Sequence, residues 1–216
     1  MTYRYKAAVF DLDGTILDTL EDLFRSTNHA LAEEKLPLRT KEEVRRFVGN
    51  GIGKLIERAC PADVTAARRE RVHAAFTRYY SEHCADTTAP YEGIPELLAK
   101  LREEGIRTGV VSNKADYAVQ SLIGEYFPGL FSSVTGEREG IARKPAPDLL
   151  FETLRKLGVT AEEAVYIGDS EVDLEAAANA GMDCIACSWG FKGENFLREH
   201  GAKVIVETPE EILRKM

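Results

Sequence analysis

The spacing of apolar and polar positions changes in character twice along the chain. The run Ala7-Ala8-Val9-Phe10 is continuously apolar, which predicts a short buried strand. From residue 18 to about 90, apolar residues recur at helical spacing and no stretch favours a strand. After residue 91 predicted helices alternate with predicted strands, which fall at 108–112, 132–135, 164–167, 184–187 and 203–206. The pattern therefore predicts an α/β core that is interrupted near its start by helices.

The alternation after residue 91 also predicts how the core is built. Strands that alternate with helices form a parallel sheet with helices on both faces, and such doubly wound (Rossmann-like) sheets bind ligands at the carboxyl ends of their strands. We expect two domains, a core of residues 1–17 and 91–216 and an all-helical insert of residues 18–90. Asp18 with Glu21 has the spacing of a capping box at the start of the insert's first helix, and a substrate role for Asp18 is the alternative.

Composition narrows the function without naming it. The 216 residues carry a net charge of −8, which argues against binding to nucleic acid or to a membrane surface through bulk charge. No apolar run approaches the length of a membrane span, and the N-terminus leads into a strand rather than a secretory signal. Cys60, Cys84, Cys184 and Cys187 suit a reducing compartment, and Cys184 and Cys187 are interpreted as plain buried thiols. We therefore expect a cytoplasmic protein.

The first candidate site is the segment Phe10-Asp11-Leu12-Asp13-Gly14-Thr15 at the end of the first strand. Where the strand turns at Gly14, the carboxylates of Asp11 and Asp13 can crowd into one crevice. Two carboxylates that close raise each other's pKa unless a cation lies between them. A hard divalent ion with oxygen ligands, Mg²⁺ above all, fits such a pair. The alternative is an ordinary Asp-Gly turn after a strand.

Three further polar groups follow predicted core strands or precede predicted helices. Ser112-Asn113 follows the strand at 108–112, Lys144 precedes Pro145 and a helix, and Asp169 with Asp173 follows the strand at 164–167. Two of these groups have a simpler explanation when taken alone, although it does not account for Asp169. Ser-Asn is common turn chemistry, and Ser170 with Asp173 could be a capping box.

Together and in this order, the four segments resemble the motifs of the haloacid dehalogenase-like hydrolases, a superfamily dominated by Mg²⁺-dependent phosphatases. The resemblance implies that a mobile helical cap is inserted after the first motif. It implies that Asp11 attacks phosphorus to give an aspartyl phosphate, and that Asp13 acts as general acid and then as general base. Mg²⁺ would be held by Asp11, Asp169 and the main-chain carbonyl of Asp13, while Ser112 and Lys144 would bind the transferring oxygens.

The remaining motif residues have supporting roles by the same resemblance. Asp173 would orient a metal-bound water or Lys144, and Thr15 would hydrogen-bond near the phosphoryl pocket. Asn113 would contact the residues that line the site rather than the substrate itself. Other proteins share parts of this pattern. A receiver domain signals through a similar acidic site, a dehalogenase needs no metal, and a phosphomutase often has Val in place of Thr15.

The substrate is the least determined feature. The stretch 47–59 resembles the corresponding cap segment of phosphoglycolate phosphatases, while its alternative is a helix start that only packs within the cap. The candidate substrate contacts are Gly49, Asn50, Gly51 and Lys54, which offer main-chain N–H groups, an amide and a positive charge. A second anionic group beside the phosphate would suit them. We expect a small phosphorylated acid such as 2-phosphoglycolate, although pyrophosphatases and nucleotidases share the core motifs. A monomer or homodimer is expected.

Overall fold

The structure, a computed structural model, describes residues 3–216. Contacts divide the chain into two compact units. The larger unit contains the described residues up to Leu17 together with Pro90–Met216, and the smaller contains Asp18–Ala89. The larger unit corresponds to the predicted catalytic core and the smaller to the predicted cap, and these two roles stay predictions.

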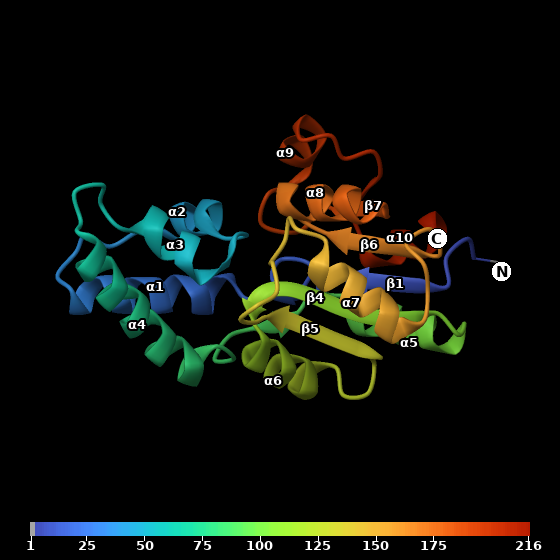
Figure 1. The fold of residues 1–216 in the computed structure, drawn as a ribbon, viewed down its shortest axis with the longest axis horizontal. Coiled ribbons are helices and arrows are strands. Elements are labelled where there is room, and N and C mark those ends of the chain that lie inside the picture. Colours follow the sequence, from blue (N-terminus) through green and yellow to red (C-terminus); the bar gives the residue numbers. More distant parts are fainter. Residues whose placement is uncertain (1–2) are drawn as a thin grey trace. The chain divides into compact units, whose positions relative to one another are not determined.

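The larger unit is built on a parallel sheet of six strands in the order β5-β4-β1-β6-β7-β8 (Figure 1). The strands are β1 (Ala7–Phe10), β4 (Arg107–Ala115), β5 (Ser133–Glu137), β6 (Ala164–Gly168), β7 (Asp183–Cys187) and β8 (Ile205–Val206). The register pairs Phe10 of β1 with Val110 of β4 and with Ile167 of β6. The residues that follow these three strands therefore emerge at one edge of the sheet.

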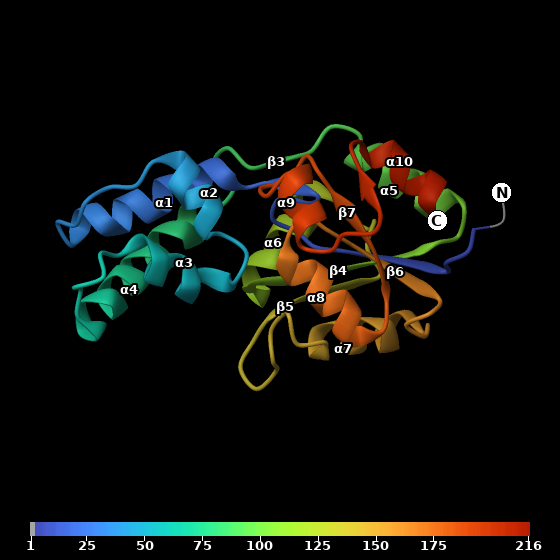
Figure 2. The ribbon, with the colours of Figure 1, turned by 90° about the horizontal axis from the view of Figure 1, so that it is seen from above.

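Helices cover both faces of this sheet, which confirms the doubly wound fold. Figure 2 shows α5 and α10 on one face and α7 and α8 on the other. The helices of the unit are α5 (Ile94–Glu103), α6 (Asp116–Tyr126), α7 (Asp148–Leu157), α8 (Glu171–Ala180), α9 (Glu194–Glu199) and α10 (Pro209–Lys215). The sequence did not predict α9. Among the described helices, none is long and apolar enough to cross a membrane.

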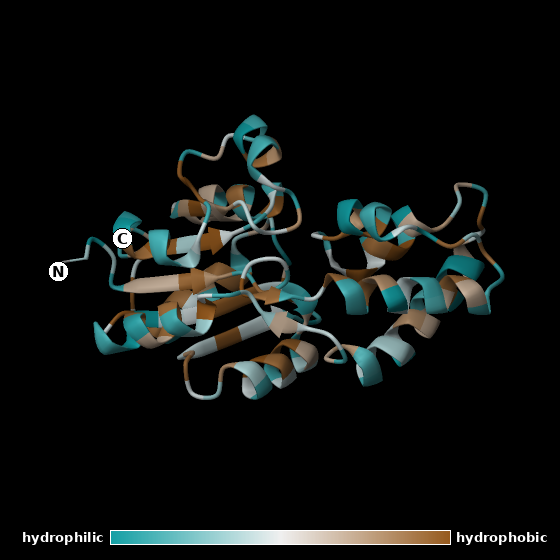
Figure 3. Cartoon of the chain, turned by 180° about the vertical axis from the view of Figure 1, so that it is seen from behind, coloured by the Kyte–Doolittle hydropathy of each residue, from teal (hydrophilic) through white to brown (hydrophobic). Residues whose placement is uncertain are grey.

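The core of the unit lies where the strands meet the helices, and Figure 3 shows hydrophobic colour concentrated on the strands. Every residue of β1 is fully buried, as its apolar run predicted. β4 is longer than predicted, because its buried run continues through Ser112, Asn113 and Lys114. Polar residues usually end a strand, but the side chains of Asn113 and Lys114 have hydrogen-bond partners inside the unit.

The smaller unit consists of α1 (Leu20–Glu33), α2 (Lys41–Phe47), α3 (Gly51–Ala59) and α4 (Ala66–His83). Two short strands, β2 (Leu17–Asp18) and β3 (Ala89–Pro90), pair with each other, so the expectation of no strand between 18 and 90 was wrong. Thr40 and Glu43 form a capping box at the start of α2. The predicted box of Asp18 with Glu21 is wrong, because α1 begins at Leu20 and Glu21 pairs with Arg25.

All four cysteines are free thiols, as expected, although only Cys60 and Cys187 are buried and the other two are partly exposed. Cys184 and Cys187 lie on β7, in agreement with the predicted strand.

Candidate active site

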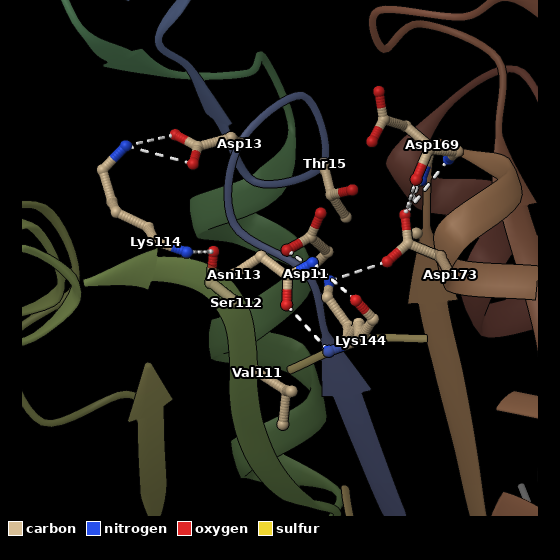
Figure 4. A network of polar contacts seen from close by, with 12 residues as sticks. Asp11, Asp13, Thr15, Val111, Ser112, Asn113, Lys114, Lys144, Asp169 and Asp173 are labelled. Carbon is tan, nitrogen blue, oxygen red and sulfur yellow. Dashed lines mark hydrogen bonds and ion pairs between the residues drawn. The ribbon is translucent and has the colours of Figure 1, made fainter. Parts of the chain in front are cut away.

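The predicted core residues gather at the carboxyl ends of β1, β4 and β6 (Figure 4). Asp11 directly follows β1, Ser112 lies on β4, and Asp169 directly follows β6. Lys144 comes from the loop before α7, and Asp173 from the first turn of α8. All five are buried, so residues up to 162 positions apart in the sequence line one polar site inside the larger unit.

The side chain of Lys144 lies at the centre of this site. Its Nζ is 2.8 Å from Oδ1 of Asp11 and 2.8 Å from Oδ1 of Asp173, and it donates a hydrogen bond of 2.8 Å to the hydroxyl of Tyr166. The main chain of Lys144 is held as well. Its N–H donates to Oδ1 of Asn113 at 2.9 Å, and Nδ2 of Asn113 donates to its carbonyl oxygen at 3.0 Å. The Lys144–Pro145 peptide bond is cis. Asn113 therefore positions the lysine that contacts Asp11.

Burial dominates the electrostatics of the acids. It raises the pKa of Asp11 to about 7, an effect that Lys144 opposes and Asp173 reinforces. Burial, followed by the charges of Asp173 and Asp11, raises the pKa of Asp169 well above its usual value. Burial alone would lower the pKa of Lys144, but contact with Asp11 and Asp173 raises it. The site thus concentrates negative charge around one ammonium.

This charge fits a divalent cation. Carboxylate oxygens of Asp11, Asp169 and Asp173 lie within 4.8 Å of one another, and oxygen ligands of this kind suit a hard cation such as Mg²⁺. The oxygens of Asp173 already accept hydrogen bonds from Tyr166, from Ser170 and from the N–H of Asp169. Asp11 and Asp169 are therefore better placed than Asp173 to act as direct ligands.

The loops around Asp169 pack with little space to spare. Gly14 has φ +85°, and a Cβ there would lie 2.5 Å from Oδ2 of Asp169. A Cβ at Gly190 would lie 2.3 Å from Cβ of Asp169. Oδ2 of Asp169 also accepts a 2.7 Å hydrogen bond from the N–H of Phe191. The glycine that turns the chain after Asp13 is thus also required by the close approach of Asp169.

The side chain of Asp13 lies differently from the sequence expectation. Figure 4 shows its carboxylate turned towards Lys114 and away from the group around Lys144. Nζ of Lys114 is 2.7 Å from Oδ1 and 3.0 Å from Oδ2 of Asp13. The charge of Asp13 does raise the pKa of Asp11, as the sequence predicted, but burial and the charge of Asp173 raise it more.

The other predicted core residues lie close by. Oγ of Ser112 accepts a 3.2 Å hydrogen bond from the N–H of Lys114. Thr15 is fully buried, and its carbonyl oxygen accepts a 3.0 Å hydrogen bond from the indole of Trp189.

Lys114 and Tyr166 are site residues that the sequence reasoning missed. Tyr166 lies within the predicted strand 164–167, and Lys114 lies just beyond the predicted strand 108–112. The signal was present for Lys114, since a lysine directly after Ser112-Asn113 follows a run of buried positions. A fully buried lysine needs a partner, and Asp13 is that partner. For Tyr166, nothing in the run Ala164-Val165-Tyr166-Ile167 distinguishes a polar contact from packing.

In the smaller unit, the candidate substrate contacts surround the start of α3. Gly49 and Gly51 have positive φ values, +126° and +77°, and Asn50 precedes the helix without capping it through its side chain. Lys54 pairs with Glu57 at 2.7 Å, and Arg58 donates to Oδ1 of Asn50 at 2.8 Å. An anion would therefore have to compete with Glu57 for Lys54, whereas Arg58 contacts the amide oxygen of Asn50 and not the NH2 group that an anion would bind.

Known proteins resemble this chain over most of its length. A family model described as haloacid dehalogenase-like hydrolase matches residues 8–187. A phosphoglycolate phosphatase of Mesorhizobium japonicum is 34% identical, with 95% of this chain and 96% of that protein covered. An N-acetylmuramic acid 6-phosphate phosphatase of Pseudomonas aeruginosa is 32% identical, with 97% of this chain and 94% of that protein covered. The crystal structure of a provisionally named phosphoglycolate phosphatase of Lactobacillus delbrueckii subsp. bulgaricus is 40% identical with a TM-score of 0.94, covering 99% of this chain and 98% of that one.

Proposed function

Because the chain belongs to the haloacid dehalogenase-like hydrolase family, we propose that it is a Mg²⁺-dependent phosphatase acting through an aspartyl phosphate. The phosphatase relatives support the reaction class. The observation that carries the proposal is the buried carboxylate of Asp11, 2.8 Å from the ammonium of Lys144 at the carboxyl end of β1. A nucleophile held beside a fixed positive charge suits phosphoryl transfer, in which positioning and charge stabilisation supply most of the catalysis.

In the first step, an oxygen of Asp11 attacks phosphorus and the bond between phosphorus and the ester oxygen breaks. Asp13 gives its proton to the leaving oxygen, so that an alcohol departs. Ser112 and Lys144 bind the oxygens of the transferring group. In the second step, Asp13 takes a proton from water as the water attacks phosphorus, which releases inorganic phosphate and restores Asp11.

Asp11, Asp169 and the main-chain carbonyl of Asp13 would hold Mg²⁺. The ion, when bound, would neutralise the charge of the acids and of the phosphoryl group. Asp173 and Asn113 keep Lys144 in place, and Thr15 supports the turn that carries Asp13.

We propose that the substrate is a small phosphate ester that also carries a carboxylate. Phosphoglycolate and N-acetylmuramic acid 6-phosphate, the compounds in the names of two relatives, both combine a phosphate with an acid group. 2-Phosphoglycolate is the smaller of the two and the first candidate. Gly49, Asn50, Gly51 and Lys54 are the proposed contacts for the acid group.

A panel of esters tests this specificity. We expect 2-phosphoglycolate to be hydrolysed with a kcat/KM at least about tenfold above that of uncharged esters such as ethyl phosphate, because a second anion gains about 1.4 kcal/mol or more from a matched site. N-Acetylmuramic acid 6-phosphate belongs in the same panel. Asn50→Ala and Lys54→Ala should reduce the preference and spare p-nitrophenyl phosphate. Equal rates for acidic and uncharged esters would remove the substrate proposal and leave the phosphatase assignment standing.

A further inference from the structure

We propose that Lys114 is a positioning residue of the phosphatase site: it sets the direction of the Asp13 carboxylate and keeps it apart from the ion pair of Asp11 and Lys144. The inference rests on the proposed function, which makes Asp13 the group that protonates the leaving oxygen.

The first argument is the geometry of the pair. Nζ of Lys114 contacts both carboxylate oxygens of Asp13, at 2.7 Å and 3.0 Å. Contacts to both oxygens place the ammonium in front of the carboxylate, close to its axis, and therefore fix the direction in which the Asp13 side chain points. The N–H of Lys114 also donates to Oγ of Ser112 at 3.2 Å. One residue thus connects the proposed proton donor with a proposed phosphoryl-binding group.

The second argument is the burial of Lys114. Its side chain is 3% exposed, and it follows the apolar residues Val110 and Val111 on the same strand. An ion pair at a buried position is often no more stabilising than apolar residues of similar size, because both charges must be removed from water. An apolar side chain of similar size at position 114 would therefore stabilise the fold about as well. A requirement for directed charge explains why a lysine stands there.

The third argument is that the two acids of the first motif contact different ammonium groups. Asp11 contacts Lys144 at 2.8 Å, and Asp13 contacts Lys114 (Figure 4). The charge of Asp13 also acts on Asp11, whose pKa it raises. Without Lys114, neither contact would hold the Asp13 carboxylate in its present direction, and it would lose the position from which it can reach the leaving oxygen.

The test compares esters that differ in their need for a proton. p-Nitrophenolate leaves without protonation, whereas an alkoxide does not, so only alkyl esters depend on a general acid. For the full chain with Mg²⁺, kcat/KM is measured with p-nitrophenyl phosphate, ethyl phosphate and 2-phosphoglycolate. This parameter covers the steps up to departure of the leaving group. A ratio of two esters on one sample is also independent of the fraction of protein that is folded.

We expect Lys114→Met to lower kcat/KM for ethyl phosphate and 2-phosphoglycolate about tenfold to a hundredfold more than for p-nitrophenyl phosphate. Lys114→Arg, which keeps the charge, should restore much of the loss. Asp13→Asn should show the same dependence on the leaving group, and adding Lys114→Met to it should cause no further selective loss, because both changes act through one carboxylate. Lys100→Met is the control. It removes a lysine of α5 that pairs with Glu103 and Glu104, and it should leave the ratios of kcat/KM between the esters unchanged.

Three results would overturn the inference. An even loss across all three esters in Lys114→Met, beside a selective loss in Asp13→Asn, would make Lys114 a structural residue only. A loss confined to 2-phosphoglycolate would mean that Lys114 contacts the acid group of the substrate. If Asp13→Asn itself showed no dependence on the leaving group, the proton-transfer role of Asp13 in the proposed function would fail first, and the inference with it.

Discussion

The two lysines of the site illustrate how single residues carry the proposed chemistry. Lys144 and Lys114 are both buried, and each lies within 2.8 Å of one acid of the first motif. The sequence predicted Lys144, because a lysine before a proline and a helix has a motif to match. It could not predict that Lys114 contacts Asp13, since the register of β1 against β4 decides that and the register is a property of the folded sheet.

Asn113 gives a prediction at this scale. Asn113→Ala removes both hydrogen bonds to the main chain of Lys144, which leaves a buried N–H and a buried carbonyl without these partners. We expect the free energy of unfolding to fall by about 1–3 kcal/mol. We also expect kcat/KM for p-nitrophenyl phosphate to fall about tenfold to a hundredfold, because the ammonium shifts relative to Asp11.

Denaturant unfolding and steady-state kinetics check both numbers. Asn179→Ala is the matched control, since the exposed Asn179 donates one hydrogen bond to the carbonyl of Pro145, the residue next to Lys144. Its effects should be small in both assays. Wild-type activity in Asn113→Ala would show that the position of Lys144 does not depend on the two hydrogen bonds with Asn113.

At the scale of elements, periodicity predicted the helices and strands whose apolar residues are buried on one or two faces. β1 matched its prediction residue for residue because all four positions are apolar and buried. The sequence missed α9, β2 and β3, and it ended β4 too early. The strands β2 and β3 have only two residues each, too few to show an alternation. The end of β4 is polar because its residues form the candidate site. The apolar pattern that predicts a strand therefore stops before the strand does.

The start of α1 gives the prediction at this scale. Asp22 is 1% exposed and accepts hydrogen bonds from the N–H and the hydroxyl of both Thr87 and Thr88. Burial alone would raise the pKa of Asp22, but these hydrogen bonds outweigh it and lower the pKa. Asp22→Asn keeps the shape and replaces an accepting oxygen by a donor that faces other donors. We expect a loss of about 2 kcal/mol in the free energy of unfolding at neutral pH.

The pH dependence of this loss follows from its sign. A lowered pKa means that the carboxylate contributes stability above its unfolded pKa of about 3.9, and that the contribution disappears as the pH falls through the folded value. The difference between wild type and Asp22→Asn should therefore shrink in acid. Urea unfolding across pH measures it, with the exposed Asp63→Asn as control. A difference that stays constant down to low pH would contradict this account of Asp22.

At the scale of the whole molecule, the order of the strands is what assembles the site. Asp11, Ser112 and Asp169 come from three neighbouring strands in the middle of a six-stranded sheet. The alternation of strands and helices predicted the doubly wound sheet, and the resemblance in four short motifs predicted the family that the comparisons show. Neither could place the side chain of Asp13, because side-chain direction at the end of a strand depends on the partner that packing brings near it.

The central claim is that Asp11 becomes covalently phosphorylated, and trapping the intermediate tests it most directly. The full chain with Mg²⁺ is quenched with acid during turnover of a radiolabelled phosphate ester, digested and mapped. We predict an acid-stable, hydroxylamine-sensitive label on the peptide that contains Asp11, with none in Asp11→Asn and none when a chelator has removed the metal. Turnover by the wild type without label at Asp11, or with label on another residue, would contradict the account.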